Sequence, residues 1–302
     1  MITLSENFRA LFYTPFYAAY ATGAYAREGV EVEFKLSSDP EQTAAALRSG
    51  QVDVMWGGPL RVLLTHDSNS DSDIVCFCDV VARDPFFIIG REPRPTFRLA
   101  DLMQVRLGTV SEVPTPWICL QDDIRRSGMD PASVMRVTDQ TMAANAAALL
   151  GGKLDAVQVF QPHAEDLLAS GGGHLWYAAA NRGLTAYTTL VTRRGVIDKK
   201  RDELLAMVRA MYRTQRWIAA TPGVEIQRIL ADYFADVPPA IFAAAIDRYR
   251  ALRLYSDDPA TRPEGFDRLA SAMRSAGVLK RNIPFEECVD NSLADQVLME
   301  GI

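Results

Sequence analysis

Two similar stretches of sequence decide the fold: residues 44–53 (AAALRSGQVD) and residues 146–155 (AAALLGGKLD). Six of the ten positions are identical, and the two copies lie 102 residues apart. In each copy an alanine-rich segment typical of a helix meets a glycine, the usual stop signal for a helix, and an aspartate then leads into a short apolar run. The repeat therefore predicts two lobes of the same construction, each with a helix followed by a buried strand.

Strands and helices alternate from the N-terminus to the end of the first copy. We predict strands at residues 8–13, 30–34 and 52–56, because these runs are apolar or alternate apolar with acidic residues. We predict helices at residues 14–29 and 39–50, since each begins with a capping residue and a proline and ends at a glycine. This order over so few residues favours a parallel sheet with crossover helices.

The second copy lies between two apolar runs, residues 86–89 and 190–191, that would carry the chain from one lobe to the other. Two such crossings would form a hinge, because lobe closure needs dihedral changes in only a few residues. We therefore expect residues 1–84 and 190–302 to form lobe I and residues 85–189 to form lobe II. The other predicted elements are a strand at 105–108 and helices at 115–127, 198–220, 224–234, 239–252 and 264–276.

The composition excludes several classes of protein. The 302 residues are 48% hydrophobic and 23% charged, as in an ordinary globular protein. The net charge of −6 argues against nucleic acid as a partner, and no apolar stretch is long enough for direct insertion into a membrane. The four cysteines form no C-x-x-C pair and the three histidines are scattered, so we expect buried reduced thiols, no metal and no cofactor.

The start of the chain bears on its location. Met1 is followed by neither the basic segment nor the apolar core of a signal peptide. We expect a cytoplasmic protein if Met1 is the native start and a periplasmic one if a leader has been removed. The common phosphate-binding, dinucleotide-binding, zinc-protease and serine-hydrolase motifs do not occur, which makes an enzyme the less favoured class.

Candidate ligand contacts lie where the predicted strands end. In open α/β sheets, ligands bind beyond the carboxyl ends of the strands, and two facing lobes would bring these segments to one cleft. We expect a binding site without catalytic residues. Its expected contacts are Tyr13, Thr14, Tyr17, Trp56, Gly57, Gly58, Arg61, Thr109, Ser111, Glu112, Trp117, Gln158, Phe160, Tyr187 and Thr188.

These candidates indicate the kind of ligand. The aromatic side chains would hold a flat ring or an apolar body between the lobes, and we expect loss of Trp56 to weaken binding. Backbone N–H groups at Gly57-Gly58 and at residues 109–111, near predicted helix starts, suit an anionic or acceptor-rich end. Arg61 would add a charged clamp.

Several candidates have an equally simple structural explanation. The aromatic ring of Tyr17 would also suit the core, and Trp117 would also cover the sheet. Arg61 would also pair with Asp67 or with another acidic residue on the surface. The sequence leaves these alternatives open.

Six short segments carry a resemblance to a known family: residues 13–19 (YTPFYAA), 23–25 (GAY), 28–32 (EGVEV), 50–54 (GQVDV), 283–284 (IP) and 289–292 (VDNS). In order and spacing they resemble the substrate-binding proteins of ABC importers for nitrate, taurine, alkanesulfonates and thiamine pyrimidine precursors. The resemblance covers nearly the whole chain. It implies an α/β, periplasmic-binding-protein-like fold with two α/β lobes, a two-strand hinge and a ligand cleft between the lobes.

The resemblance also implies a function and a set of contacts. The protein would capture a small organic molecule, thiamine-pyrimidine-precursor-like, sulfonate-like or an aromatic acid, by lobe closure. Its partner would be an ABC permease in the membrane. By position, the residues expected to line the cleft are Tyr17, Trp56, Gly57, Thr109, Gln158 and Tyr187.

An enzyme on the same scaffold is the alternative. A eukaryotic branch of the fold makes the thiamine pyrimidine with an active-site histidine and a CCCFC motif, whereas this chain has only residues 76–78 (CFC), in a different part of the fold. Other relatives are decarboxylases or desulfinases. A cytoplasmic enzyme acting on a pyrimidine or an aromatic acid would use Cys119, His163 or Glu112 for covalent or acid–base chemistry. Each of these three residues would equally suit a structural role.

Overall fold

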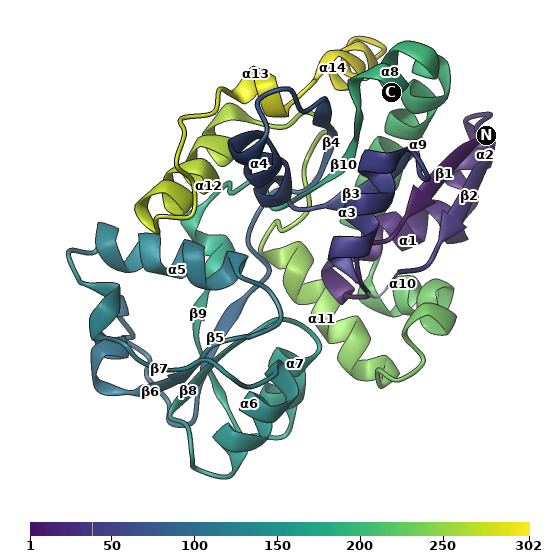
Figure 1. The fold of residues 1–302 in the computed structure, drawn as a ribbon. Coiled ribbons are helices and arrows are strands. Elements are labelled where there is room, and N and C mark those ends of the chain that lie inside the picture. Colours follow the sequence, from purple (N-terminus) through teal and green to yellow (C-terminus); the bar gives the residue numbers. More distant parts are fainter. Residues whose placement is uncertain (38) are drawn as a thin grey trace.

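The computed structural model describes residues 1–37 and 39–302 and contains two five-stranded sheets flanked by helices (Figure 1). The first sheet has the strand order β2-β1-β3-β10-β4, with β1 (Ile2–Ser5), β2 (Val32–Lys35), β3 (Val54–Gly57), β4 (Ile74–Val81) and β10 (Thr188–Arg193). The second has the order β7-β6-β8-β5-β9, with β5 (Phe87–Gly90), β6 (Arg106–Gly108), β7 (Met135–Val137), β8 (Ala156–Val159) and β9 (His174–Ala178). In each sheet the first three strands are parallel, and the fourth is antiparallel to both its neighbours. The two sheets therefore share one topology.

The sequence repeat has a structural counterpart. Helix α3 (Pro40–Ser49) leads into β3, and helix α6 (Met142–Leu150) leads into β8, so each copy supplies the third strand of its sheet. The repeated aspartate has the same backbone contact in both lobes. The Asp53 carboxylate accepts from the backbone N–H of Thr3 at 3.0 Å, and the Asp155 carboxylate accepts from that of Arg106 at 2.9 Å. The prediction of two lobes built alike is confirmed.

The first predicted strand and helix were wrong in place and in length. The first strand is β1 at residues 2–5, whereas residues 11–13 form a 3₁₀ turn. Thr14 does not cap the helix that follows; it lies in the first turn, and its hydroxyl donates to the carbonyl of Leu11 at 2.7 Å. The helix breaks at Gly23, whose φ of 72° is left-handed, and this divides it into α1 (Thr14–Ala21) and α2 (Ala24–Arg27).

The remaining helices cover the sheets. Those that follow strands of the two lobes are α4 (Pro59–Ser68), α5 (Thr115–Arg126) and α7 (His163–Ala169). The C-terminal third contains α8 (Arg194–Lys199), α9 (Arg201–Ala220), α10 (Gly223–Leu230), α11 (Pro239–Ala251), α12 (Pro263–Ser275), α13 (Phe285–Cys288) and α14 (Ser292–Met299). The four helices predicted in this region are confirmed, although the first of them is interrupted at Lys200. The sequence analysis did not predict α13 and α14.

The chain passes between the sheets twice, at residues 82–86 and at residues 179–187. The two crossing segments are hydrogen-bonded to each other. The N–H of Ala179 donates to the carbonyl of Phe86 at 2.9 Å, and the N–H of Thr185 donates to the carbonyl of Ala82 at 2.8 Å. The lobe boundaries expected after residues 84 and 189 stay a prediction.

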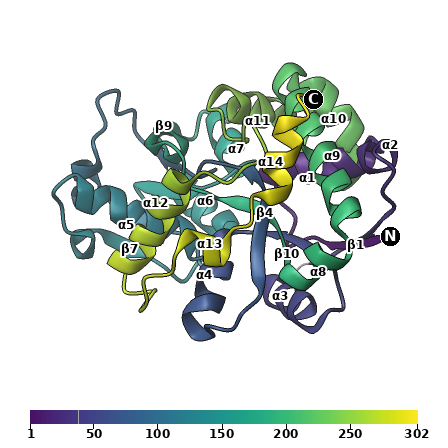
Figure 2. The same ribbon diagram turned by 90° about the horizontal axis from the view of Figure 1, so that it is seen from above.

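Helices of the two lobes also contact each other on either side of the crossings. Helix α5 packs beside α12, where the Arg125 side chain donates to the Ser275 hydroxyl at 3.2 Å (Figure 2). Helix α7 packs beside α11, where Arg248 forms an ion pair with Glu165. These contacts between helices stabilise the relative position of the two lobes in this structure.

The cysteines are buried and free, as predicted, at positions 76, 78, 119 and 288. No single helix in the described part of the chain is long and apolar enough to cross a membrane, and the one pair that qualifies by length and composition, Gly223–Phe234 with Pro239–Ala251, is bent by 119°.

Candidate functional site

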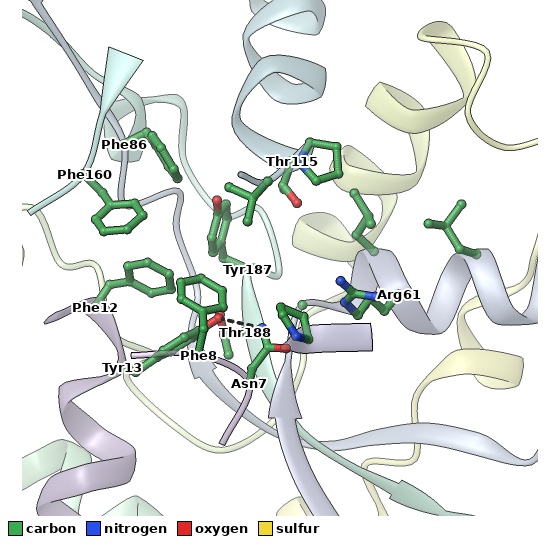
Figure 3. Close-up of a pocket in the computed structure, with 16 residues that line it drawn as sticks. Asn7, Phe8, Phe12, Tyr13, Arg61, Phe86, Thr115, Phe160, Tyr187 and Thr188 are labelled. Carbon is green, nitrogen blue, oxygen red and sulfur yellow. Dashed lines mark hydrogen bonds between the residues drawn. The ribbon is translucent and has the colours of Figure 1, made fainter. Parts of the chain in front are cut away.

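A cavity of about 230 Å³ lies between the two sheets, and its wall comes from both lobes and from both crossings (Figure 3). Lobe I contributes the segment before α1 and the first turn of α4. Lobe II contributes the loop before α5 and the residue after β8. Tyr187 and Thr188 lie where the chain returns to lobe I. Because so many separate segments meet here, a change in lobe position would change the shape of this cavity.

One side of the cavity is aromatic. Phe12 of lobe I contacts Phe160 of lobe II edge to face, with ring centroids 5.3 Å apart, and Phe160 in turn contacts Phe86 at 5.2 Å. The ring of Phe12 also lies 6.0 Å from that of Tyr187, and Phe8 completes the lobe I side (Figure 3). These rings offer apolar surface and ring edges to a flat ligand from several directions.

The opposite side of the cavity is polar. The Asn7 side-chain N–H donates to the Tyr13 hydroxyl at 3.2 Å, the dashed contact in Figure 3. Asn7 Oδ1 is buried and has no hydrogen-bond partner among the described residues. A buried acceptor without a donor is costly, so this atom is suited to an N–H or O–H group of a ligand. Burial raises the pKa of Tyr13, which keeps its hydroxyl protonated and able to donate.

Two helices begin at the cavity. Gly58 precedes the first turn of α4, and Thr115 is the first residue of α5; both line the cavity. The positive dipole end of each helix favours an anionic or acceptor-rich group, and the remaining N–H groups of each first turn add to this, since Pro59 and Pro116 have none. Arg61 adds a guanidinium at the same side, 2.5 Å from the carboxylate of Glu41. The acid that pairs with Arg61 is therefore Glu41; Asp67 instead accepts from backbone N–H groups of the C-terminal segment.

Six of the expected contacts line this cavity: Tyr13, Gly58, Arg61, Phe160, Tyr187 and Thr188. The other nine do not, and four of these belong to the core of lobe I. Trp56 is fully buried, with its ring stacked 4.8 Å from that of Phe16 and 5.4 Å from that of Phe34. Tyr17 is equally buried and donates its hydroxyl to Glu6 at 2.8 Å. Thr14 and Gly57 are likewise buried within α1 and β3.

The other five belong to lobe II and stabilise its loops. The Thr109 hydroxyl accepts from Arg136 at 3.0 Å, and the Arg136 guanidinium lies 3.7 Å from the centre of the Trp117 ring. Glu112 accepts from the N–H of Met142 at the start of α6, at 2.9 Å, and from the N–H of the exposed Ser111 at 3.1 Å. The buried Gln158 side chain donates to the carbonyl of Pro116 at 2.9 Å.

Residues that the sequence analysis missed form much of the wall. Phe8 and Phe12 were missed because residues 8–13 were predicted to be a strand, which hid the irregular segment that turns toward the cavity. Asn7 lies just before that predicted strand and was assigned to no element. Phe86 was assigned to a crossing strand only. Thr115 was correctly predicted to begin a helix but was not counted as a ligand contact. A helix that starts opposite the other lobe was the feature of the sequence that could have identified it as part of the cavity wall.

The three candidates for catalysis lie elsewhere. Cys119 is buried, and this burial raises the pKa of its thiol, the opposite of what a reactive thiolate needs. Glu112 fixes the start of α6, as described above. His163 does not line the aromatic cavity; it lines a neighbouring crevice that shares Phe160 with that cavity, and burial lowers the pKa of His163. Within residues 1–37 and 39–302, no group of three or more His, Cys, Asp or Glu side chains is arranged to hold a metal ion.

Two matched lobes, a double crossing and a cavity between them define a periplasmic-binding-protein-like fold, which confirms the predicted fold class. Residues 12–224, more than half of the chain, match the family described as NMT1/THI5 like. The chain belongs to this NMT1/THI5-like family, so the resemblance found in the sequence is confirmed.

Individual relatives differ in what their descriptions say. The chain is 23% identical over 301 residues to "Putative binding protein YtlA" of Bacillus subtilis (strain 168), covering 99% of this chain and 90% of that protein. Among solved structures, the periplasmic aliphatic sulphonate binding protein SsuA from Escherichia coli matches with a TM-score of 0.75 and 14% identity, over 95% of this chain and 96% of that one. The desulfurization enzyme DSZB matches with a TM-score of 0.73 and 13% identity over 100% of both chains. At such identities these structures share the fold and nothing more specific.

Proposed function

We propose that this protein is the substrate-binding component of an ABC import system and that it captures a small organic molecule by lobe closure. The observation that carries the proposal is the cavity whose wall is divided between two lobes and a crossing. A ligand that contacts both lobes stabilises the closed arrangement over the open one, which is capture by population shift. The similarity to the sulphonate-binding protein SsuA and to the putative binding protein YtlA supports this class.

The wall of the cavity favours a ligand with three features. Its body is flat and aromatic or heteroaromatic, because the rings of Phe12, Phe86 and Phe160 surround the apolar side. One end is anionic or rich in acceptors, since it meets two helix N-termini and Arg61. An N–H or O–H group donates to Asn7 Oδ1. Thiamine-pyrimidine-precursor-like molecules, aromatic acids and aromatic sulfonates each combine at least two of these features.

The partner and the location follow from this class. A substrate-binding component delivers its ligand to an ABC permease, so we propose a permease as the partner. We propose a periplasmic or otherwise extracytoplasmic location, because SsuA is a periplasmic protein.

An enzyme is the second candidate, and the likeness to DSZB is the observation that favours it. Against it stands the wall of the cavity. Among the described residues that line it, the ionisable groups are Tyr13, Arg61 and Tyr187, and burial raises the pKa of both tyrosines. None of these is a nucleophile or a base near neutral pH.

Native mass spectrometry of freshly purified protein, beside a denatured sample, distinguishes the two candidates. An added mass present natively and lost on denaturation identifies a captured molecule and supports the binding function. An added mass that persists on denaturation indicates a covalent intermediate and favours the enzyme. If the protein carries no added mass, thermal denaturation is measured instead, with a panel of aminopyrimidines, aromatic acids and aromatic sulfonates. If none of these three classes raises the melting temperature, the proposed ligand is contradicted.

The ligand found in this way then tests the polar contact. Asn7→Ala should weaken its binding by about 10- to 100-fold, because a buried hydrogen bond to the ligand is lost. The exposed Asn69, which follows the C-terminal end of α4 whereas the cavity lies at the N-terminal end of that helix, gives a matched control: Asn69→Ala should bind as the wild type does. Equal affinity of Asn7→Ala and Asn69→Ala in isothermal titration calorimetry would remove Asn7 from the site.

A further inference from the structure

Both crossings are fixed to lobe II at a buried ionic cluster. Arg182 of the second crossing, with a side chain only 4% exposed, contacts the carboxylates of Asp84 in the first crossing and Asp123 in α5, each at 2.5 Å. The Tyr177 hydroxyl of β9 donates to Asp123 at 2.8 Å. A buried arginine held by two carboxylates is costly to separate from them, so residues 84 and 182 move with lobe II.

On the other side, both crossings are fixed to lobe I by backbone hydrogen bonds. The N–H groups of Ala82 and Arg83 donate to the carbonyl of Leu254 at 3.0 and 3.3 Å. Thr185 in turn donates to Ala82. The dihedral changes of lobe closure therefore fall between residues 83 and 84 and between residues 182 and 185. Gly183 in the second interval has φ 101° and ψ −161°, a conformation that is essentially available to glycine alone.

A second cavity, of about 150 Å³, lies against these intervals. Its wall includes Arg83 from the first crossing, Leu184 from the second, and the segment 253–262 that precedes α12. It shares no lining residue with the aromatic cavity described above. An occupant of this second cavity would touch both crossings at the points where they bend.

The polar group of interest in this cavity is Asp79, on β4, which is 97% buried. One carboxylate oxygen, Oδ2, accepts from the Ser256 hydroxyl at 2.8 Å. The other, Oδ1, is buried and has no hydrogen-bond partner among the described residues. Burial, together with the neighbouring Asp258 carboxylate, raises the pKa of Asp79 to about 7, although the hydrogen bond from Ser256 acts in the opposite direction. A carboxylate left half satisfied inside a protein is matched by a cation that donates N–H bonds.

The other charged groups around this cavity already have partners. Arg253 forms an ion pair with Asp257, and Arg262 forms one with Asp258. Arg83 donates to the carbonyl of Ala180 at 3.2 Å. Asp79 is therefore the charged side chain of this wall whose hydrogen-bonding capacity is not used within the described chain.

We propose that the cavity beside Asp79 is a second ligand site, separate from the aromatic cavity, and that it takes a small cation with N–H donors, an ammonium ion or a primary ammonium group. The carboxylate of Asp79 receives the N–H bonds through Oδ1. The volume of about 150 Å³ excludes bulky amines. The occupant lies between Arg83 and Leu184, so it contacts both crossings beside the hinge.

Thermal denaturation of the full chain with ammonium chloride tests this proposal. Near pH 8, where Asp79 is mostly ionised, ammonium should raise the melting temperature in a saturable way, by about 3 °C at ten times the dissociation constant. Tetramethylammonium chloride at the same ionic strength has no N–H donor and should give no such rise. An equal rise in melting temperature with tetramethylammonium or with sodium chloride would show a general effect of salt and would contradict the proposed site. The absence of any rise with ammonium would contradict it as well.

Variants locate the effect. Asp79→Asn should abolish the ammonium-dependent rise, whereas Asp71→Asn, at an exposed position, should keep it. Leu184→Trp fills the same cavity from the second crossing without touching the carboxylate, and it should abolish the rise even if Asp79→Asn does not fold. A rise that survives in folded Asp79→Asn or in Leu184→Trp would place ammonium elsewhere and contradict the proposal.

Discussion

The third strands of the two sheets come from the repeat, and a comparison of their ends shows what the duplication preserves. At an offset of 102, Trp56 corresponds to Gln158, and Gly58 corresponds to Phe160. The first pair is buried away from the aromatic cavity, whereas both members of the second pair line it. The repeat therefore preserves the direction in which each position faces, and the residue types at these positions differ between the lobes.

The chemical difference at the second pair has a steric reason. A Cβ at Gly58 would lie 3.2 Å from the carbonyl oxygen of Tyr187, which is tighter than an ordinary contact. Lobe I therefore has a glycine where the second crossing returns to it, whereas lobe II has room for the ring of Phe160. The polar groups of the cavity come mainly from lobe I, through Asn7 and Arg61. Two lobes of one topology thus contribute different chemistry to one site.

The largest effect we predict concerns Trp56, the buried member of the first pair. Trp56→Ala should lower the free energy of unfolding by about 3–5 kcal/mol, because a stacked and fully buried ring leaves a large void. The protein that remains folded should bind its ligand nearly as the wild type does, since Trp56 does not line the cavity. Urea unfolding and calorimetry measure the two effects separately. Intact stability with lost binding would restore Trp56 as a ligand contact.

The next largest effect is a dependence of stability on pH, and it concerns the last strand in the order of each sheet, β4 in lobe I and β9 in lobe II. Strand β4 has the buried carboxylate of Asp79, whereas β9 has a tryptophan and a tyrosine. Burial raises the pKa of Asp79 in the folded protein to about 7, well above the usual value of an aspartate. As pH rises through that interval the unfolded chain loses its proton first, so the free energy of unfolding falls, by an amount on the order of a few kcal/mol. The contribution of Asp79 to this free energy is highest below the pKa of the unfolded chain and levels off above about pH 7.

Urea unfolding between pH 4 and pH 8 measures this dependence on pH. Asp79→Asn should remove most of the fall, since the amide does not titrate, while Asp71→Asn should leave it in place. A fall of the same size in Asp79→Asn would assign it to another group.

A third effect concerns Phe160, the lobe II residue of the pair that lines the cavity. Phe160→Ala should weaken ligand binding by about 10- to 100-fold, because its ring contacts Phe12 across the lobes and forms part of the cavity wall. The loss of stability should be smaller than for Trp56→Ala, since Phe160 borders a cavity rather than filling the core. Leu150→Ala, at an exposed position on the same lobe, is the control and should bind normally. Unchanged affinity in Phe160→Ala would exclude the aromatic cavity as the site.

The repeat and the capping signals predicted the two-lobe topology and most helices, because periodicity and helix stops act over short distances. The cavity was harder to predict, since its residues come from irregular segments whose direction depends on packing between lobes. Residues 8–13 are apolar enough for a strand, yet they form a loop and a 3₁₀ turn over the cavity. Trp56 has the composition of a ligand contact, but the rings of Phe16 and Phe34, distant in sequence, stack on it.

The smallest effects concern the repeated aspartates, whose backbone contact is the same in both lobes. Asp155→Ala should lower the free energy of unfolding by about 1 kcal/mol, the net value of a charged acceptor bound to a backbone N–H. Asp53→Ala should cost more, since its carboxylate contacts the Lys200 ammonium at 2.9 Å and is 18% exposed, whereas the Arg91 and Arg106 guanidinium groups lie 3.6 and 3.7 Å from the Asp155 carboxylate, which is 31% exposed. The excess comes from the closer and more buried ion pair and should shrink in high salt, whereas the backbone hydrogen bond that both lobes share should persist. Urea unfolding at low and high salt separates the two parts, and equal losses at both positions would mean that Lys200 adds nothing to the role that the repeat preserves.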